Sequence, residues 1–593
     1  MRPFLKQHRN ALIGGLLAFV IVSGLLLADL RFQGVVWRFL YHQTGEESIV
    51  GQVRGFVELL GNLIRQQPNT QPLTPIQHTD TPPYGMNVFL QKEVEEPKIR
   101  AMLQMIQEAG FVWLRQEFPW EDLEIDGRGQ FTDSRNDLNG DGTKDTQDAW
   151  AKYDRIVALT EEYGFRMMVR LSNPPDWAIA DNPTIGTFAP PDDLQDYVNY
   201  AVAVATRYKG KITYYQIWNE PNIYPEWGEQ FADPVAYTDM LCRTYRALKQ
   251  VDPNIVVISA AIAPTISLDG FMGYQDVVYL QNMYDAGAGE CFDVLAAQGY
   301  GLFSGAMDRR LRLTTVNVAR HTYYRDLMIA NGDAAKPIWI SEAAWNAVLD
   351  ATLPPDQIVQ YDRFGLATQA QAARYMPQLY QRAQEEWSWV GVIFYWFFTQ
   401  PDTSEVTQSS YYFRMVEPDY SPEKPTFTPF PVYTAMKDYI TTQTPTLYRG
   451  VHQAESWQIT SDRVLVDDDK AQFGKAVENS TFSFVASGTD VWLRLKSNVA
   501  VTVQVGDETM VVQGSERWQD VRVMTSTLPQ TMNITLESDA PFLLDSILVE
   551  DNTWNNVAVV SVLGGVLLGA VVGVVGFGLY SRFKQIRLVR ENS

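Results

Sequence analysis

The stretch Tyr-Tyr-Gln-Ile-Trp-Asn-Glu-Pro-Asn at residues 214–222 decides the fold of this chain. Tyr215, Ile217 and their neighbours predict a short buried strand, which stops at a Glu between an amide and a proline. This pattern places Glu220 at the carboxyl end of the strand. A carboxyl group fixed there is poorly solvated and can have a raised pKa, as a general acid working near neutral pH requires.

A second apolar strand ends in the same way, in Pro-Ile-Trp-Ile-Ser-Glu-Ala at residues 337–343. Glu220 and Glu342 converge only if their strands share one sheet and point the same way, as in a parallel α/β barrel. Apolar strands alternate with helical segments over residues 84–440, which is typical of such a barrel. We predict its strands at 85–89, 111–115, 166–171, 212–218, 255–260, 294–298, 338–341 and 391–396.

The two glutamate motifs also carry a family resemblance. Trp-Asn-Glu-Pro at residues 218–221, followed by a strand-end Ile-Ser-Glu at 340–342, resembles the clan A glycoside hydrolases, with families 5 and 39 the most similar. The resemblance implies a (β/α)8 TIM barrel and a retaining β-glycosidase that acts on a poly- or oligosaccharide. It implies that Glu220 is the acid/base and Glu342 the nucleophile, and that catalysis needs no cofactor.

The resemblance implies roles for three more residues. Arg115, at the predicted end of the second strand, would bind the nucleophile carboxylate, and Asn219 would hydrogen-bond the sugar 2-hydroxyl. Tyr300 would support the nucleophile, although Gln298 stands where several families have His. The alternatives are a surface Arg for Arg115 and a local turn for Asn219.

Two further residues near strand ends are candidates for substrate binding. Asn173 could reach the substrate or form a turn before two prolines. Trp396 could stack on a sugar or belong to the core. The five histidines are scattered outside the strand-end motifs, which disfavours histidine-based nucleophilic catalysis and a multi-histidine metal site.

Two other functions fit the same residues. A transglycosylase would use the same two glutamates but accept a sugar in place of water. A non-catalytic carbohydrate-binding protein would keep the barrel without turnover, but the presence of both glutamates together with Asn219 and Arg115 argues against a decayed site.

The loop at residues 137–148 matches a calcium-binding loop of the EF-hand or dockerin kind, with Gly at its sixth position. We therefore expect a structural calcium ion, and the alternative is an Asp/Asn/Gly-rich turn. The expected ligands are Asp137, Asn139, Asp141, Thr143, Asp145 and Asp148.

Two apolar runs predict transmembrane helices, one at 11–28 after three basic residues and one at 557–580 before four more. The positive-inside rule then places both termini in the cytoplasm. We therefore expect a cell-membrane protein with an extracytoplasmic catalytic domain. A cleaved signal peptide is the alternative for the first run.

The rest of the sequence completes the expected domain order. The net charge of −22 disfavours nucleic acid as a partner, and Cys242 and Cys291 could form one disulfide outside the cytoplasm. The stalk within 32–83 either lies on the membrane or packs under the barrel. We predict a tail and membrane helix at 1–31, a stalk and Pro-rich linker at 32–83, the barrel at 84–440, a jelly-roll-like β-sandwich with a carbohydrate-binding module as one interpretation at 447–552, and a membrane helix with a basic tail at 557–593.

Overall fold

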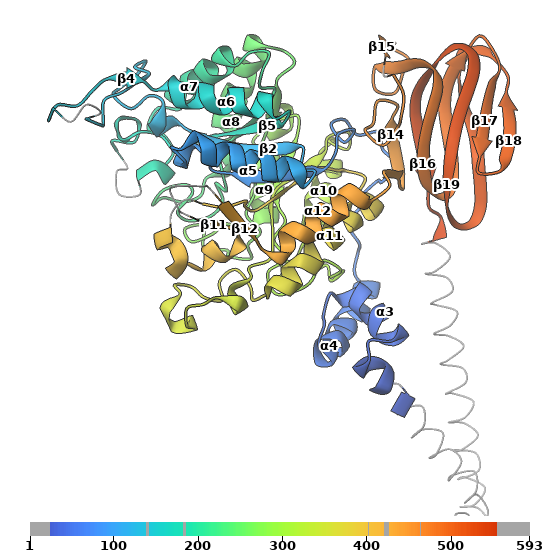
Figure 1. Cartoon of the computed structure of the whole chain (residues 1–593), viewed down its shortest axis with the longest axis horizontal. Coiled ribbons are helices and arrows are strands. Elements are labelled where there is room, and N and C mark those ends of the chain that lie inside the picture. Colours follow the sequence, from blue (N-terminus) through green and yellow to red (C-terminus); the bar gives the residue numbers. More distant parts are fainter. Residues whose placement is uncertain are drawn as a thin grey trace, which may run out of the picture.

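The computed structural model describes residues 24–25, 27–137, 141–181, 186–400, 403–419, 426–462 and 464–553. Two N-terminal helices are followed by a parallel α/β barrel and then by a mostly antiparallel sheet domain (Figure 1).

The barrel is a closed ring of parallel strands. They pair in the order β7-β6-β5-β2-β1-β10-β9-β8, and a parallel bridge between Ile258 and Val294 closes the ring. Each of the eight predicted strands overlaps one of the observed strands. These are β1 Tyr84–Val88, β2 Trp113–Pro119, β5 Arg166–Ser172, β6 Tyr214–Ile217, β7 Val256–Ile258, β8 Leu295–Gln298, β9 Ile338–Ala343 and β10 Val390–Tyr395.

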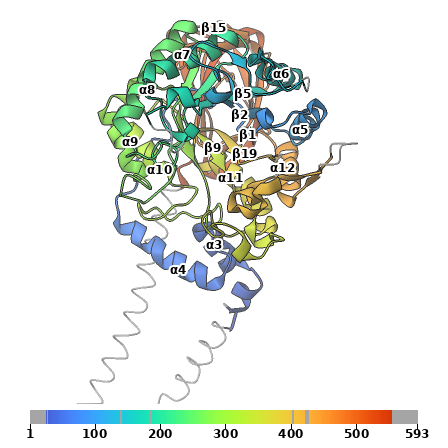
Figure 2. The same ribbon diagram turned by 90° about the vertical axis from the view of Figure 1, so that its left-hand side faces the viewer.

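Helices between the strands lie outside this ring (Figure 2). Side chains cap the starts of some of these helices: the Asp233 side chain accepts from two backbone N–H groups of α8, and Thr368 forms a capping box with Gln371 in α11. The helices are α5 Glu96–Glu108, α6 Trp150–Glu162, α7 Leu194–Arg207, α8 Pro234–Val251, α9 Asp276–Asp285, α10 His321–Ala330, α11 Gln369–Glu386 and α12 Pro431–Thr442. Short 3-10 helices lie at Gly61–Ile64, Leu90–Lys92, Trp120–Asp122, Asp176–Ala178, Gly186–Phe188, Ala288–Glu290, Val348–Asp350, Pro355–Gln357, Thr403–Thr407 and Ser409–Phe413.

An aromatic layer fills the barrel interior. The rings of Trp113, Tyr214 and Trp339 pack against one another with centroids 4.8 to 5.2 Å apart. Side chains two residues apart on a strand share one face, so Arg115 and Gln216 form the next interior layer towards the carboxyl ends. The polar layer that contains Arg115 and Gln216 therefore packs on a buried aromatic layer.

The C-terminal domain has its own buried apolar core, which includes Phe482, Leu493 and Ile547. Its long strands β16 and β19 pair with each other in successive antiparallel segments. Trp457 joins this domain to the barrel, because its ring packs edge-on against Tyr84 of β1 with centroids 6.0 Å apart. The sheet contains β13 Thr446–Leu447, β14 Gly450–Gln453, β15 Val464–Asp467, β16 Lys475–Ser497, β17 Val501–Val505, β18 Glu508–Val512 and β19 Ser515–Glu550. Two small antiparallel pairs belong to barrel loops, namely β3 Thr132–Asp133 with β4 Gln147–Asp148, and β11 Val416–Asp419 with β12 Thr426–Pro429.

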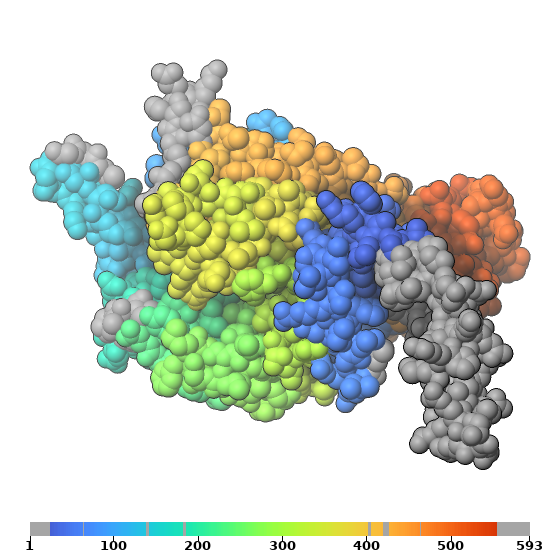
Figure 3. Space-filling model, turned by 90° about the horizontal axis from the view of Figure 1, so that it is seen from below, coloured from blue at the N-terminus to red at the C-terminus, as the bar shows by residue number. Residues whose placement is uncertain are grey.

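The N-terminal helices α3 Val35–Thr44 and α4 Ile49–Leu60 pack against the barrel, which is one of the two arrangements expected for the stalk (Figure 3). Tyr41 Oη donates to Gln378 Oε1 on α11 at 2.6 Å. Glu47 forms an ion pair with Arg374 on the same helix.

The fold class predicted from the sequence needs one correction, which concerns its two transmembrane helices. Among the described residues, no helix is long and apolar enough to cross a membrane. The run 557–580 and residues 11–23 of the first run lie outside the described residues. The described fold is therefore a barrel followed by a sheet domain, without the predicted spanning helices.

The two cysteines form a disulfide, a pairing that the sequence left open. Cys242 of α8 is bonded to Cys291, which directly follows the 3-10 helix Ala288–Glu290 and precedes β8. The bond links helix α8, outside the barrel, to the segment that leads into β8.

Candidate active site

The second barrel strand is longer than predicted, and this changes the position of Arg115. We expected Arg115 at the end of that strand, but β2 continues to Pro119 and pairs with β5 as far as Ser172. Arg115 therefore lies inside the barrel mouth rather than at its rim. The apolar pattern that defined the strand stops at Arg115, although the backbone pairing does not.

Arg115 is the centre of a buried hydrogen-bond network. Its side chain is 3% exposed and donates to Glu342 Oε1 at 2.8 Å. It also donates to Asn87 Oδ1 and Gln216 Oε1 at 2.8 Å, and to Asn219 Oδ1 at 3.2 Å. A buried cation with several acceptors stabilises the negative charge of the carboxylate that it contacts.

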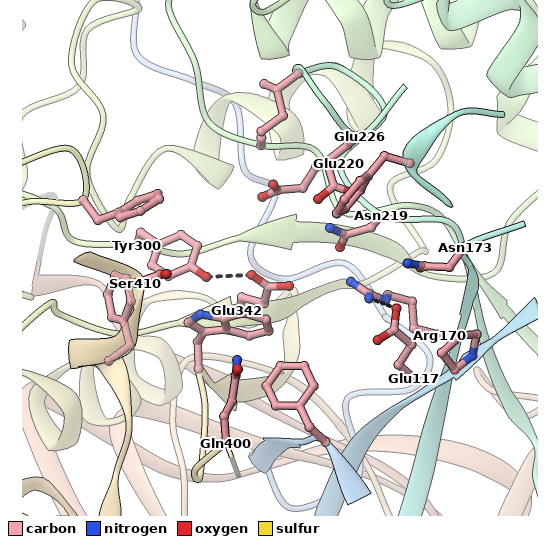
Figure 4. A pocket seen from close by; sticks show the side chains of 18 of the residues that line it. Glu117, Arg170, Asn173, Asn219, Glu220, Glu226, Tyr300, Glu342, Gln400 and Ser410 are labelled. Carbon is pink, nitrogen blue, oxygen red and sulfur yellow. Dashed lines mark hydrogen bonds and ion pairs between the residues drawn. The ribbon is translucent and has the colours of Figure 1, made fainter. Parts of the chain in front are cut away.

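Glu342, at the end of β9, is held at both oxygens. Arg115 donates to Oε1, and the hydroxyl of Tyr300 donates to Oε2 at 2.6 Å (Figure 4). Burial and the nearby charge of Glu342 raise the pKa of Tyr300 well above its ordinary value, so its hydroxyl keeps its proton. Because donors contact both oxygens, the direction of the Glu342 carboxyl group is fixed.

Glu220 has a different environment. Burial, followed by the charges of Glu342 and Glu226, raises the pKa of its carboxyl from 4.5 to about 8. Gln298 Nε2 donates to Glu220 Oε1 at 2.8 Å, and Ser341 Oγ donates to the amide oxygen of Gln298 at 3.1 Å. Ser341 thereby orients the Gln298 amide so that its NH2 group faces Glu220.

A sharp backbone turn after β6 presents Asn219 and Glu220 to the barrel mouth. Trp218 has a φ of +75°, in the left-handed region that a bulky residue rarely adopts. Its indole N–H donates to Glu226 O at 2.8 Å, which helps to hold the turn. A conformation of this kind costs about 1–3 kcal/mol and persists only where the surrounding structure enforces it.

Both glutamates open into one cavity of about 800 Å³ at the carboxyl ends of the strands (Figure 4). Arg115 lies beneath this cavity and does not line it. Of the predicted site residues, the cavity is lined by Asn173, Asn219, Glu220, Tyr300, Glu342 and Trp396.

Asn173 and Trp396 combine the roles that the sequence left open. Asn173 forms a turn, with a φ of +61° and a carbonyl that accepts from Glu121 N at 2.8 Å, yet it also lines the cavity. Trp396 is half-buried, packs edge-on against Phe89 and Phe397, and also lines the cavity.

Sequence reasoning missed several charged residues in this cavity. Glu117 and Arg170 form an ion pair on the neighbouring strands β2 and β5. Glu117 stands two residues after Arg115, so strand alternation would have found it if β2 had been drawn to its full length. Glu226 lies in a loop and has no such signal. Glu121 also lines the cavity, and burial raises its pKa to about 7.

The described part of the predicted calcium loop does not form a metal site. Among the described residues, no group of three or more His, Cys, Asp or Glu side chains could hold a metal ion. Asn139 lies outside the described residues. The expected ligands instead accept hydrogen bonds within the loop, Asp137 from Gly142 N, Asp141 from Thr143 N and Oγ1, and Asp148 from Trp150 N, while Asp145 N donates to Asn136 O. These contacts are those of the Asp/Asn/Gly-rich turn that was the alternative.

Comparison with known proteins finds no matching family model and no matching curated protein. Glycoside hydrolases recur among the similar solved structures. A family 39 glycoside hydrolase from Bacteroides cellulosilyticus is 16% identical, over 79% of this chain and 83% of that chain, with a TM-score of 0.43. A beta-xylosidase from Caulobacter crescentus is 14% identical, over 80% and 98%, with a TM-score of 0.39. A family 30 endoxylanase from Clostridium papyrosolvens is 13% identical, over 79% and 99%, with a TM-score of 0.37. Identities of 13–16% with TM-scores of 0.43 or lower do not transfer a substrate or a mechanism to this chain. Both are therefore inferred from the residues of the site.

Proposed function

We propose that this protein is a retaining β-glycoside hydrolase that acts on poly- or oligosaccharide. The observation that carries the proposal is the contrast between two carboxyl groups that share one cavity. Donors stabilise the charge of Glu342, whereas burial and neighbouring charges favour the protonated form of Glu220. Two carboxyl groups with opposed environments are the acid/base and nucleophile pair that this chemistry uses.

In the first step, a Glu342 carboxylate oxygen bonds to the anomeric carbon while the glycosidic C–O bond breaks. Glu220 gives its proton to the departing oxygen, which leaves as a hydroxyl group. The hydrogen bond from Tyr300 and the ion pair with Arg115 direct the carboxylate towards the sugar.

In the second step, Glu220 is ionised and takes a proton from water. The water oxygen bonds to the anomeric carbon, and the bond to Glu342 breaks, so that both carboxyl groups return to their starting states. A raised pKa lets the same group act as acid and then as base near neutral pH.

The remaining residues of the cavity would bind the sugar. Arg115 holds Asn219 through its Oδ1, so the Asn219 amide is positioned for a sugar hydroxyl. Trp396 offers an aromatic ring beside Phe89, suited to stacking on a pyranose face. The disulfide between Cys242 and Cys291 supports a location outside the reducing cytosol.

A panel of aryl β-glycosides and β-linked polysaccharides tests this proposal. We expect turnover of at least one substrate, and losses of about 10²–10⁴-fold in E220Q on a substrate with a poor leaving group. Turnover in E342Q should be lost. E108Q, on the exposed end of α5, is the matched control and should keep full activity.

Product analysis completes this test. Release of saccharides shorter than the substrate supports hydrolysis. Saccharides longer than the substrate, formed as fast as the substrate is consumed, would indicate a transglycosylase. No turnover on the whole panel, or full activity in E342Q, would contradict the proposal.

A further inference from the structure

The outward side of the N-terminal helices is an apolar surface. Large apolar side chains here stay exposed, with Val53 at 53%, Val57 at 63% and Val50 and Val35 at 80%. We call this surface the outer patch. Its members are Phe32, Val35, Val36, Phe39, Val50, Val53, Val57, Leu60 and Ile64.

An ordinary surface helix buries its apolar side, but helix α4 buries polar and small residues and exposes its apolar ones. Its inward side is polar or small: Gln52 and Gly55 are buried, and Glu58 pairs with Arg310 of the barrel. Its apolar residues at 49, 53, 57 and 60 follow one exposed stripe, and Ile64 of the following 3-10 helix is exposed as well. Contiguous exposed apolar surfaces of this kind mark interaction sites.

Helix α3 continues the same surface. Phe32, Val35 and Phe39 lie at helical spacing and are exposed, and the ring of Phe39 packs edge-on against Phe56 of α4 at 6.4 Å. The inward side of α3 is fixed by Tyr41, which is buried and bonded to the barrel. Both helices therefore carry exposed apolar side chains, and they lie next to each other at one side of the barrel (Figures 2 and 3).

The charges around the outer patch show which partner it fits. The acidic side chains of residues 27–67 are all engaged: Asp29 accepts from Trp37 N, Glu46 and Glu58 pair with Arg310, and Glu47 pairs with Arg374. The arginines of the same segment are exposed, namely Arg31, Arg38, Arg54 and Arg65, and Arg54 also pairs with Glu58 at 3.2 Å. A chain with a net charge of −22 therefore has a local surface that is apolar with a basic edge.

We infer that the outer patch docks on an anionic lipid bilayer, with α3 and α4 lying in the plane of the headgroups. Helices that bind in this way place aliphatic and Phe side chains below the headgroups and Arg beside the phosphates. The contact is made by the described helices alone and requires no membrane-spanning helix.

A single-site fluorescent label on the full chain tests this inference. Because Cys242 and Cys291 are bonded to each other and are the only cysteines, a V53C variant carries one thiol for an environment-sensitive dye. V464C is the matched control, since Val464 of β15 is 52% exposed against 53% for Val53. Each labelled protein is mixed with vesicles of neutral lipid, or of neutral lipid with phosphatidylglycerol, and its emission is recorded.

We expect the V53C label to shift to shorter wavelength and gain intensity several-fold with anionic vesicles, less with neutral ones, and to be quenched by a lipid-borne quencher. The V464C label should not change. An unchanged V53C spectrum, or equal changes at both sites, would overturn the inference. A shift without vesicles that grows with protein concentration would instead indicate contact between two copies and would overturn it as well.

Discussion

Gln298 Nε2 donates a hydrogen bond to Glu220 Oε1 at 2.8 Å, so a neutral amide contacts the proposed acid/base. This bond favours the ionised carboxylate and opposes the burial that raises the pKa of Glu220. Substitution Q298L should therefore raise that pKa further, and the alkaline limb of the kcat/KM profile should move up by about one pH unit.

The pH profile of S341A serves as the comparison, because it removes the group that orients the amide but keeps the amide itself. It should move the alkaline limb in the same direction by less. An alkaline limb at the wild-type pH in Q298L would show that the bond does not tune Glu220.

Glu220 should also make stability depend on pH. Its pKa is raised from 4.5 to about 8 on folding, so the stabilisation that its protonation provides is complete below pH 4.5 and is lost as pH rises through about 8. E220Q cannot ionise at this position. The melting temperature of E220Q, measured relative to that of the wild type, should therefore rise by about 2 °C or more as the pH is raised from about 5 to about 9. A difference in melting temperature between E220Q and the wild type that stays constant across this range would contradict the raised pKa of Glu220. The control variant E108Q should show the same pH dependence of melting temperature as the wild type.

Removing Arg115 should affect both stability and turnover. R115M leaves the Glu342 carboxylate buried without its cation, which should cost about 3–5 kcal/mol of unfolding free energy. Loss of this positioned charge should also lower turnover by about 10²–10³-fold. The double variant R115M/E342M removes both charges and should melt above R115M, as thermal unfolding would show. A wild-type melting temperature in R115M would mean that the ion pair does not stabilise the fold.

The sequence predicts the barrel well because its strands are buried and apolar. Glu342 lies near the end of β9 and Glu220 lies three residues after β6, so their convergence follows once the strands are placed in one parallel sheet. The end of β2 was predicted too early, at Arg115, because Arg115, Gln116 and Glu117 are polar although they belong to the strand. A search for apolar residues therefore stops before the strand does.

Other parts of the site depend on contacts that a sequence does not display. Glu226 comes from a loop, and its place beside Glu220 depends on the turn at Trp218. The loop at 137–148 has a composition that suits both a metal site and a turn, so spacing alone could not decide between them. Likewise, helical spacing in α4 revealed an apolar stripe but not the side on which the barrel lies.

The central claim is that Glu342 attacks the sugar and Glu220 transfers the proton, and the configuration of azide products tests it most directly. An aryl β-glycoside with a good leaving group is incubated with azide and with E342A or E220A. In E342A, azide should enter the space of the lost carboxylate and give the glycosyl azide of inverted configuration. In E220A, Glu342 should still form the glycosyl-enzyme, and azide should replace water to give the azide of retained configuration. The opposite pattern of products would contradict the assignment of the two roles.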